Sequence, residues 1–191
     1  MGIKKLPDNI DYSEYQSPSG MSTRHWGKWC WNFLFTSIMG TYPRKIDSSN
    51  AQHIIVRNAF KTMLTSLSLV MPCVFCRESF KGFMKELPID EYLIGRIELM
   101  YWLYLMKDKV NKKLVCQEQK CYNDEKKKLK SMFYKKQITE TEYYNHIKKA
   151  KKDIFVTVET PPFKEILNKY ENLRAACSKK AKTCSILKKQ V

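Results

Sequence analysis

Cys73 and Cys76 stand three residues apart in the stretch SLVMPCVFCRESF, which covers residues 67–79. This spacing is typical of half a zinc site, of a redox-active dithiol, or of two inert thiols buried side by side. Pro72 directly precedes the pair, and proline favours the entry to a helix. A cysteine at a helix N-terminus lies near unpaired N–H groups and the positive end of the helix dipole, which stabilise its thiolate and lower its pKa. Because thiolate is the species that attacks a disulfide, this placement favours redox chemistry.

Cys116 and Cys121 are a second cysteine pair that could form a zinc site together with the first. With Cys73 and Cys76 they would supply the four ligands that a structural zinc site needs, although their C-x4-C spacing is loose. Metal-binding turns are usually rich in glycine and polar residues, whereas a long apolar helix and Phe75 flank the first pair. Redox chemistry therefore fits better than zinc, but zinc ligands and inert core thiols stay open.

Cys177 and Cys184 form a third pair in the lysine-rich tail. Seven residues of intact helix would separate their Cα atoms by about 10.5 Å. That separation is too long for a disulfide, so they could pair only if the helix unwound. Cys30 lies in an aromatic segment and is expected to be a buried, unpaired thiol.

Helical patterns dominate the residues that must position the first pair. Residues 25–42 (HWGKWCWNFLFTSIMGTY) are almost continuously apolar, and Pro43 follows them. Further helices are expected from a capping-box pattern at 49–52, from the cysteine pair to Pro88, and over about 90–109. No stretch of residues 21–110 alternates as a strand does. We therefore expect an all-α fold, a four-helix bundle.

The amino-acid composition becomes lysine-rich beyond Cys121. A basic helix is expected over residues 126–136, and a second capping box at 139–142 opens a helix that ends near Lys152. The segment DIFVTVETPPF reads as extended, and its two prolines open a last helix. We divide the chain into a flexible N-terminal segment (1–20), a bundle domain (21–121) and a lysine-rich helical extension (122–191).

Charge follows the same division. The 191 residues carry a net charge of +16, and 43% of them are hydrophobic, which supports a packed core. Residues 107–191 hold 23 of the 35 lysines and arginines but only 10 of the 19 acidic residues. This excess indicates either a solvated lysine surface or attraction to an acidic partner, a membrane or nucleic acid.

The first 20 residues are polar and turn-rich and contain no apolar signal core, so we expect no signal peptide and an intracellular protein. No apolar run approaches the roughly 20 residues of a transmembrane helix. In a reducing compartment, seven cysteines indicate metal or redox chemistry more often than structural disulfides.

Three motifs in sequence order resemble those of the Erv/ALR-type FAD-linked sulfhydryl oxidases. The first is similar to the family's Trp-Gly-Arg-x-x-Trp-x-x-Leu-His helix, the second is the Cys-x-x-Cys pair after proline, and the third is similar to the family's Tyr/Trp and His-Asn-x-Val-Asn-x-x-Leu helix. In this chain they read His25-Trp26-Gly27-Lys28-x-x-Trp31-x-x-Leu34-Phe35, Cys73-x-x-Cys76, and Tyr101-Trp102 followed by Lys107-Asp108-x-Val110-Asn111-x-x-Leu114. The opening His-Trp-Gly is most like the versions in large cytoplasmic DNA viruses. The resemblance covers about residues 21–121.

This resemblance implies a bundle of four helices plus a short fifth helix that holds FAD, with a redox-active disulfide between Cys73 and Cys76. It also implies a set of cofactor-binding residues: Lys28, Trp31, Phe35, Tyr42, Trp102, Lys107, Asp108, Val110, Asn111 and Leu114. No metal is implied. An isoalloxazine ring is a flat apolar plate that the aromatic members of this set could enclose, while the lysines and Asn111 could reach phosphates, ribose or the ring edge. Plain core packing and solvated lysines are the competing interpretations.

The chain departs from the family pattern at several positions. Lys28 replaces the family arginine and loses its planar fork. Phe35 and Lys107 replace two histidines, and Asp108 replaces an asparagine. Cys121 matches the first cysteine of a structural disulfide whose usual partner is absent.

The implied activity is disulfide formation in substrate proteins. A substrate dithiol attacks the disulfide at Cys73, Cys76 passes two electrons to FAD, and dioxygen takes them as hydrogen peroxide. Cys116/Cys121 and Cys177/Cys184 are candidate relay pairs.

The implied partners are a thiol-containing protein or a thioredoxin-like carrier, and dioxygen. A homodimer and an acidic partner for the basic tail are further expectations. If the protein is viral, the host cytoplasm and the virion are its expected locations. Two other functions stay open, a non-enzymatic basic binding module and a zinc-stabilised structural protein.

Because the bundle holds every motif that the chemistry requires, we expect the extension to select partners rather than to form the cofactor site.

Overall fold

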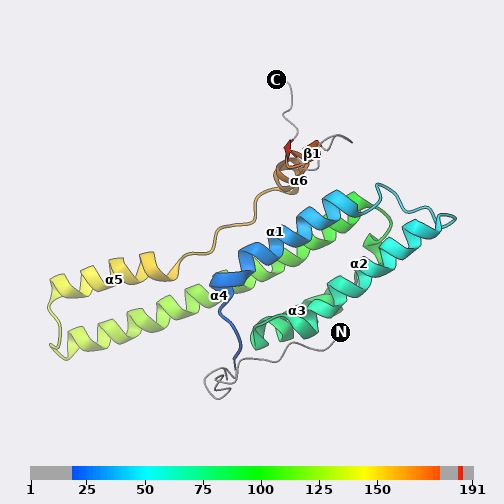
Figure 1. The fold of residues 1–191 in the computed structure, drawn as a ribbon. Coiled ribbons are helices and arrows are strands. Elements are labelled where there is room, and N and C mark those ends of the chain that lie inside the picture. Colours follow the sequence, from blue (N-terminus) through cyan, green and yellow to red (C-terminus); the bar gives the residue numbers. More distant parts are fainter. Residues whose placement is uncertain (1–18, 177–184, 187–191) are drawn as a thin grey trace, which may run out of the picture.

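The computed structural model describes residues 19–176 and 185–186, which are almost entirely helical (Figure 1). The helices are α1 (Thr23–Thr41), α2 (Ala51–Val70), α3 (Val74–Glu86), the 3-10 turn η2 (Asp90–Tyr92), α4 (Arg96–Tyr134), α5 (Glu140–Ile154) and α6 (Phe163–Glu171). A two-residue antiparallel pair joins β1 (Ala175–Ala176) to β2 (Ser185–Ile186). The predicted all-α class is confirmed.

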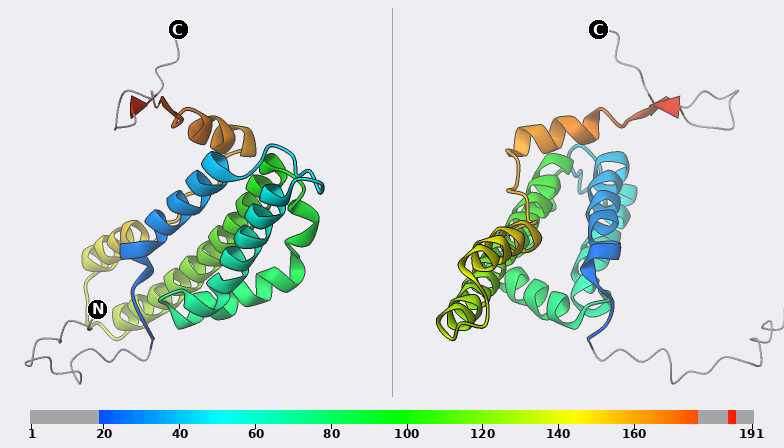
Figure 2. Two further views of the ribbon diagram at one scale, coloured as in Figure 1. Left: turned by 45° about the vertical axis from the view of Figure 1, so that its right-hand side comes forward. Right: turned by 90° about the vertical axis from the view of Figure 1, so that its left-hand side faces the viewer.

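Helices α1 to α4 form a bundle around one apolar core (Figure 2). Helix α4 supplies a buried stripe at helical spacing, and α1 faces it with a second stripe. The buried residues of these two helices are Leu34, Phe35, Ile38, Met39, Leu99, Met100, Trp102, Leu103 and Met106. The core therefore lies between α1 and the first half of α4, with α2 and α3 closing the other side.

Local capping explains where two of the helices begin. Asn50 caps α2, because its side chain accepts the N–H groups of Gln52 and His53. The predicted capping box at 49–52 is therefore wrong in its details, since asparagine caps α2 by itself. The second predicted capping box is confirmed at α5, where Thr139 and Glu142 bond reciprocally.

Helix α4 is much longer than the sequence pattern suggested. It runs unbroken for 39 residues, from Arg96 to Tyr134, so the helices expected over 90–109 and 126–136 are parts of one element. The segment contains no glycine or proline, and lysine, glutamate and glutamine are good helix formers. The change from apolar to basic composition alters what surrounds the helix and does not interrupt it.

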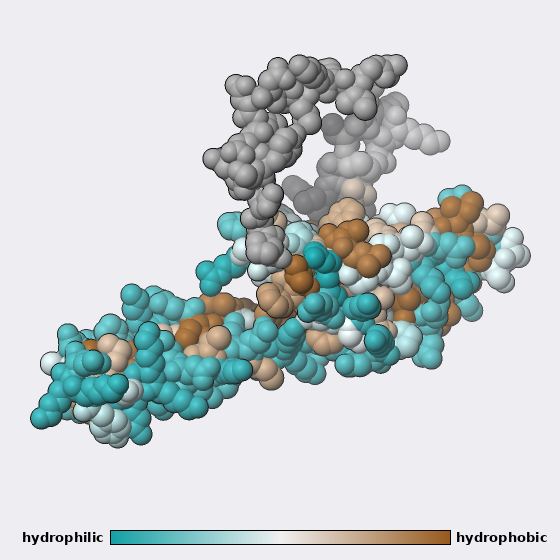
Figure 3. Space-filling model, turned by 90° about the horizontal axis from the view of Figure 1, so that it is seen from below, coloured by the Kyte–Doolittle hydropathy of each residue, from teal (hydrophilic) through white to brown (hydrophobic). Residues whose placement is uncertain are grey.

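The far half of α4 pairs with α5 in a hairpin that projects from the bundle (Figure 1). On the face seen in Figure 3, the hairpin end is largely hydrophilic, which matches the concentration of lysines there. Within residues 19–176 and 185–186, no helix combines the length and apolar character that crossing a membrane requires.

Helix α6 returns to the bundle instead of extending away from it. Ile166 and Tyr170 are buried in the same core as α1 and α4, with exposed fractions of 6% and 5%. The sequence pattern placed this helix in a separate extension, whereas the structure packs it on the bundle core; partner selection by the extension stays a prediction. Its apolar face packs on α1 and α4 because Phe163, Ile166, Leu167 and Tyr170 recur at helical spacing.

Candidate active site

Cys73 is the N-cap residue of α3. Its Sγ accepts the backbone N–H of Cys76 at 3.3 Å, which confirms the predicted position of the pair at a helix N-terminus. Pro72 precedes the cap, and Met71 is buried beneath it. Both cysteines are partly buried free thiols in this structure.

The segment before α1 holds the cysteine loop in place. Met21 donates its N–H to the Pro72 carbonyl at 2.7 Å, and Val74 donates to the Ser19 carbonyl at 3.3 Å. Gly20 lies between these bonds with a φ of +78°, and a Cβ there would approach the Pro72 oxygen to 1.8 Å. Sequence reasoning missed this role and assigned residues 1–20 to a flexible segment. The only signal was a glycine in the polar sequence SPSG.

The surroundings of Cys76 disfavour its thiolate form. Burial raises its pKa to about 12, and the hydrogen bond and charge of Cys73 act in the same direction. The cations Lys113 and Arg77 oppose this shift. The thiolate chemistry expected of Cys76 therefore requires a change in its surroundings. Loss of its hydrogen bond with Cys73, or the arrival of an electron acceptor nearby, would be such a change.

Helix α4 runs beside the dithiol. Lys113 donates a hydrogen bond to Ser79 of α3, and Lys109 pairs with Glu86 at 2.6 Å. These contacts place Lys109 and Lys113 of α4 next to α3, whereas Lys107 and Asn111 lie about 200° around the helix from them. The structure thereby brings the second and third sequence motifs together.

The first motif lies on the first half of α1, antiparallel to α4. The end of α1 meets the start of α4 through Tyr42, whose carbonyl accepts the Arg96 Nε–H at 2.6 Å. At the opposite end, Trp26 donates to the Met21 carbonyl at 3.2 Å, close to the cysteine loop. Trp26 of the first motif and the cysteine loop therefore lie at the same end of the bundle.

Three of the four predicted cofactor-binding aromatics, Phe35, Tyr42 and Trp102, are core residues. Tyr42 and Trp102 are both 0% exposed. The Tyr42 hydroxyl donates to the Leu93 carbonyl at 2.8 Å, and the Trp102 indole donates to the Leu87 carbonyl at 3.0 Å. Packing and these hydrogen bonds account for both side chains.

Phe35 and Trp31 both lie on α1, and Phe35 is buried with 1% of its surface exposed. The rings of Trp31 and Phe35 are 6.5 Å apart, and Trp31 is partly buried. Phe35 is covered by Tyr170 of α6, with ring centroids 5.1 Å apart and an interplanar angle of 20°. Sequence reasoning missed Tyr170, whose only signal was its apolar spacing in the last helix.

The remaining predicted cofactor residues are more polar or more exposed. Asp108 pairs with Lys112 at 2.7 Å, Val110 is partly buried, and Leu114 and Lys28 are exposed. Asn111 uses its side-chain amide on the extension, donating to the Val158 carbonyl at 3.3 Å and to Thr160 Oγ1 at 2.9 Å. Lys107 is half-buried, and burial lowers its pKa.

The candidate relay cysteines do not form a close pair. Cys116 and Cys121 are exposed on the continuous helix α4, where five residues correspond to an axial rise of about 7.5 Å. A disulfide between them would require the helix to unwind. Cys177 and Cys184 lie outside the described residues. Cys30 is a partly buried free thiol, and burial raises its pKa.

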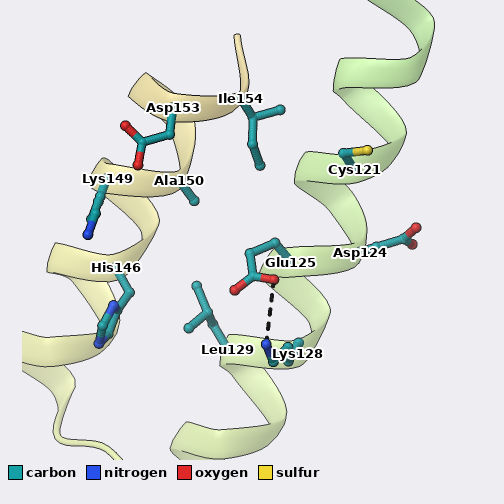
Figure 4. A pocket seen from close by; sticks show the side chains of 10 residues that line it. All are labelled: Cys121, Asp124, Glu125, Lys128, Leu129, His146, Lys149, Ala150, Asp153 and Ile154. Carbon is teal, nitrogen blue, oxygen red and sulfur yellow. Dashed lines mark ion pairs between the residues drawn. The ribbon is translucent and has the colours of Figure 1, made fainter. Parts of the chain in front are cut away.

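Cys121 lines an open pocket in the hairpin between α4 and α5 (Figure 4). The pocket also contains His146, Lys149 and Leu129, and its Lys128 pairs loosely with Glu125 at 3.9 Å. None of the three sequence motifs contributes to it. In the described part of the chain, no group of three or more His, Cys, Asp or Glu side chains is placed to hold a metal ion.

A family model described as the Erv1 / Alr family matches residues 28–138, more than half of the chain. The chain belongs to the Erv1/Alr family. Among solved structures it is similar to the yeast Erv1 core, with 23% identity and a TM-score of 0.41. That match covers 56% of this chain and 84% of the yeast chain. A comparison with curated proteins finds no match.

The side chains at the α1–α4 face suit the flavin dinucleotide that Erv1/Alr proteins generally bind. Trp31 offers an aromatic surface and Lys107 is a half-buried cation, while the Asn111 amide is engaged by Val158 and Thr160. No ion pair joins Lys107 to a carboxylate in the described part of the chain. An aromatic surface on α1 and an unpaired cation on α4 are groups that suit a ring system carrying phosphates.

Proposed function

We propose that this protein is an FAD-linked thiol oxidase that forms disulfide bonds in substrate proteins through Cys73 and Cys76. Family membership supports the reaction class, and the position of Cys73 as N-cap of α3 is the observation that supports the residue assignment. When bound, FAD accepts two electrons from the reduced cysteine pair and passes them with two protons to dioxygen, which gives hydrogen peroxide.

The two cysteines have different roles in this proposal. A substrate thiolate attacks the Cys73 sulfur of the oxidised pair, so that the Cys73–Cys76 bond breaks and a mixed disulfide forms. The second substrate thiol then attacks the substrate sulfur of that mixed disulfide, which releases substrate disulfide and reduced Cys73. The N-terminus of α3 stabilises negative charge on Cys73 during both steps.

The surrounding residues position this chemistry. Lys113 and Arg77 favour the thiolate of Cys76 against the effect of burial. Trp31, Lys107, Asn111 and the other α1 and α4 residues named by the family resemblance would hold the cofactor. Substrates would be a protein dithiol or a thioredoxin-like carrier.

The test uses purified protein reconstituted with FAD. We expect a flavin absorbance spectrum, oxygen uptake with dithiothreitol, and one peroxide per two thiols oxidised. Cys73→Ser and Cys76→Ser should each abolish oxygen uptake while leaving flavin bound, and the exposed Cys116→Ser is the matched control. Protein that binds no flavin and consumes no oxygen would refute the function, while an active Cys73→Ser variant would refute only the assignment.

We also propose that the protein is of the kind found in large cytoplasmic DNA viruses. The opening His25-Trp26-Gly27 supports this origin. Such an origin would place the protein in the host cytoplasm and in the virion. Detection of the protein in purified virions by mass spectrometry would test this.

Homodimerisation is a further proposal, supported by an exposed aromatic pair on α1. Trp29 and Phe33 are 69% and 62% exposed and lie one helical turn apart. Sedimentation of the protein and of a Trp29→Glu/Phe33→Glu variant tests whether this face joins two copies. The basic hairpin remains the proposed surface for an acidic partner.

A further inference from the structure

The chain between α5 and α6 lies along α4. We call residues 155–162 the strap. Its first part is fixed at Phe155, whose ring lies 5.2 Å from Tyr122, and at Thr157. The Thr157 N–H and hydroxyl both donate to Glu118 Oε1, at 3.0 Å and 2.6 Å.

The strap then reaches the α4 residues of the third motif. Asn111 donates to Val158 and Thr160 as described above, and the ring of Phe163 packs 5.0 Å from Tyr101. Asn111 lies two helical turns before Glu118 on the same face of α4. The strap therefore runs antiparallel to α4 and delivers α6 to the side of the bundle where it contacts both α1 and α4.

Helix α6 is anchored to α1 through Tyr170. Tyr170 stacks on Phe35, and its hydroxyl donates to Asn32 Oδ1 at 2.8 Å. Both partners are on α1. Phe35 and Asn111 are predicted cofactor residues, so the extension covers the face to which the family resemblance assigns the cofactor.

Lys107 of α4 and the exposed Lys169 of α6 are close enough at this cover for their charges to interact. Lys107 of α4 is half-buried, and Lys169 of α6 is close enough that its charge lowers the pKa of Lys107, after the larger effect of burial. In the described part of the chain, neither lysine has an ion pair with a carboxylate; Lys169 lies over the Tyr170 ring at 5.4 Å. Two like charges close to each other repel, and an anion bound near both would offset that repulsion.

We propose that α6 completes the cofactor site, with Lys169 and Lys107 binding the diphosphate of FAD and Tyr170 holding α6 against α1. This inference rests on the proposed function, because that function supplies a diphosphate at this face. Asn111 donates both of its amide hydrogens to the strap, so it positions the cover rather than the diphosphate. Tyr170 is a positioning residue, since its contacts are with Phe35 and Asn32.

The experiment measures binding of FAD and of riboflavin to apo full-length protein by fluorescence titration. Riboflavin has the same ring system and lacks the diphosphate. Lys169→Glu should weaken FAD binding at least roughly tenfold, because a charge-assisted contact is replaced by repulsion. Riboflavin affinity should stay within about twofold, and Lys169→Arg should keep most of the FAD affinity.

Lys164→Glu is the matched control. Lys164 is an exposed lysine of the same helix, and five residues turn it about 140° away from Lys169. The Lys164→Glu substitution changes the net charge by the same amount as Lys169→Glu and should leave the FAD affinity within about twofold of wild type. Circular dichroism melting of the apo variants checks that each one is folded.

Each outcome has one meaning. Wild-type protein that binds neither flavin refutes the proposed function itself. Wild-type protein that binds FAD equally well with Lys169→Glu and Lys164→Glu leaves the function standing and overturns the role of α6. Tighter FAD binding by Lys169→Glu also overturns it, because α6 would then compete with the cofactor.

Discussion

Cys76 holds its proton unusually tightly for a cysteine. Burial, reinforced by Cys73, raises its pKa to about 12. Without a bound acceptor, only about one Cys76 in ten thousand is a thiolate at pH 8. The side chain that must deliver electrons is therefore kept protonated until its surroundings change.

Alkylation of the reduced apo protein tests this state. We expect iodoacetamide at pH 8 to label Cys76 more slowly than Cys73 or the exposed Cys116, as measured by peptide mass spectrometry. Labelling of Cys76 should rise about tenfold for each pH unit below its pKa. Labelling of Cys76 as fast as Cys116 would contradict the raised pKa.

Ionisation of Tyr42 makes the stability of the fold depend on pH in the alkaline range. Burial raises its pKa to about 12, whereas a tyrosine in the unfolded chain titrates near pH 10. Because the folded state holds the proton more tightly, this stabilisation is complete below pH 10 and is lost as pH rises towards 12. The loss amounts to at most about 2–3 kcal/mol.

Tyr42→Phe removes the titrating group together with its hydrogen bond to Leu93. We expect the variant to be less stable than wild type by about 1 kcal/mol at pH 8. The difference should shrink and then reverse between pH 10 and 12. Urea unfolding at a series of pH values measures it, and a constant difference would refute the ionisation argument.

At the scale of elements, the start of α3 depends on a segment that precedes α1. Ser19 and Met21 bond to the cysteine loop on either side of Gly20. The apolar pattern of the sequence predicted helices α1, α2 and α3 because each buries a periodic stripe. It could not predict this clamp, since backbone hydrogen bonds between distant segments leave no side-chain pattern.

Gly20→Ala should loosen the clamp. The new Cβ would collide with the Pro72 oxygen at a positive φ, so we expect a loss of about 1–3 kcal/mol in unfolding free energy. Labelling of Cys73 should also change, because its loop loses two hydrogen bonds. Gly40→Ala is the control, since Gly40 lies in α1 with no atom within 4 Å of its added Cβ. That change should raise stability by about 0.5–1 kcal/mol, and matching effects of the two variants would contradict the clamp.

The length of α4 shows where composition misleads. A change from apolar to lysine-rich sequence near residue 109 suggested an end, yet α4 continues to Tyr134. Composition indicates which side of a helix faces solvent, whereas the end of a helix requires glycine, proline or a capping residue. The two site halves on α1 and α4 were predictable as motifs, but their antiparallel alignment comes from tertiary packing.

At the scale of the whole molecule, the extension and the bundle share one core. Sequence reasoning assigned residues 122–191 to a separate unit because the family motifs end before them. The contacts of Tyr170 with Phe35 and Asn32 join residues far apart in the chain, and no local pattern announces such a pairing. The division at residue 121 stays a prediction.

Truncation measures this dependence. A chain that ends at Ile154 loses the burial of Ile166 and Tyr170, which we expect to lower the unfolding free energy by about 3–6 kcal/mol. A chain that ends at Ala176 keeps α6 and its contacts and is the matched control. Equal melting temperatures for the two truncated proteins would show that α6 is not part of the cooperative core.

The hydrogen bond between Tyr170 and Asn32 closes a loop of 138 residues. During synthesis, the ribosome must pass residue 170 before this bond can form, although α1 to α3 have emerged long before. Nascent chains can therefore assemble the cysteine loop early but must wait for α6 to complete the wall over α1. Uptake of a cofactor at that wall would follow translation of the bundle, and a chain interrupted before α6 would display Phe35 to the quality-control machinery of the cell.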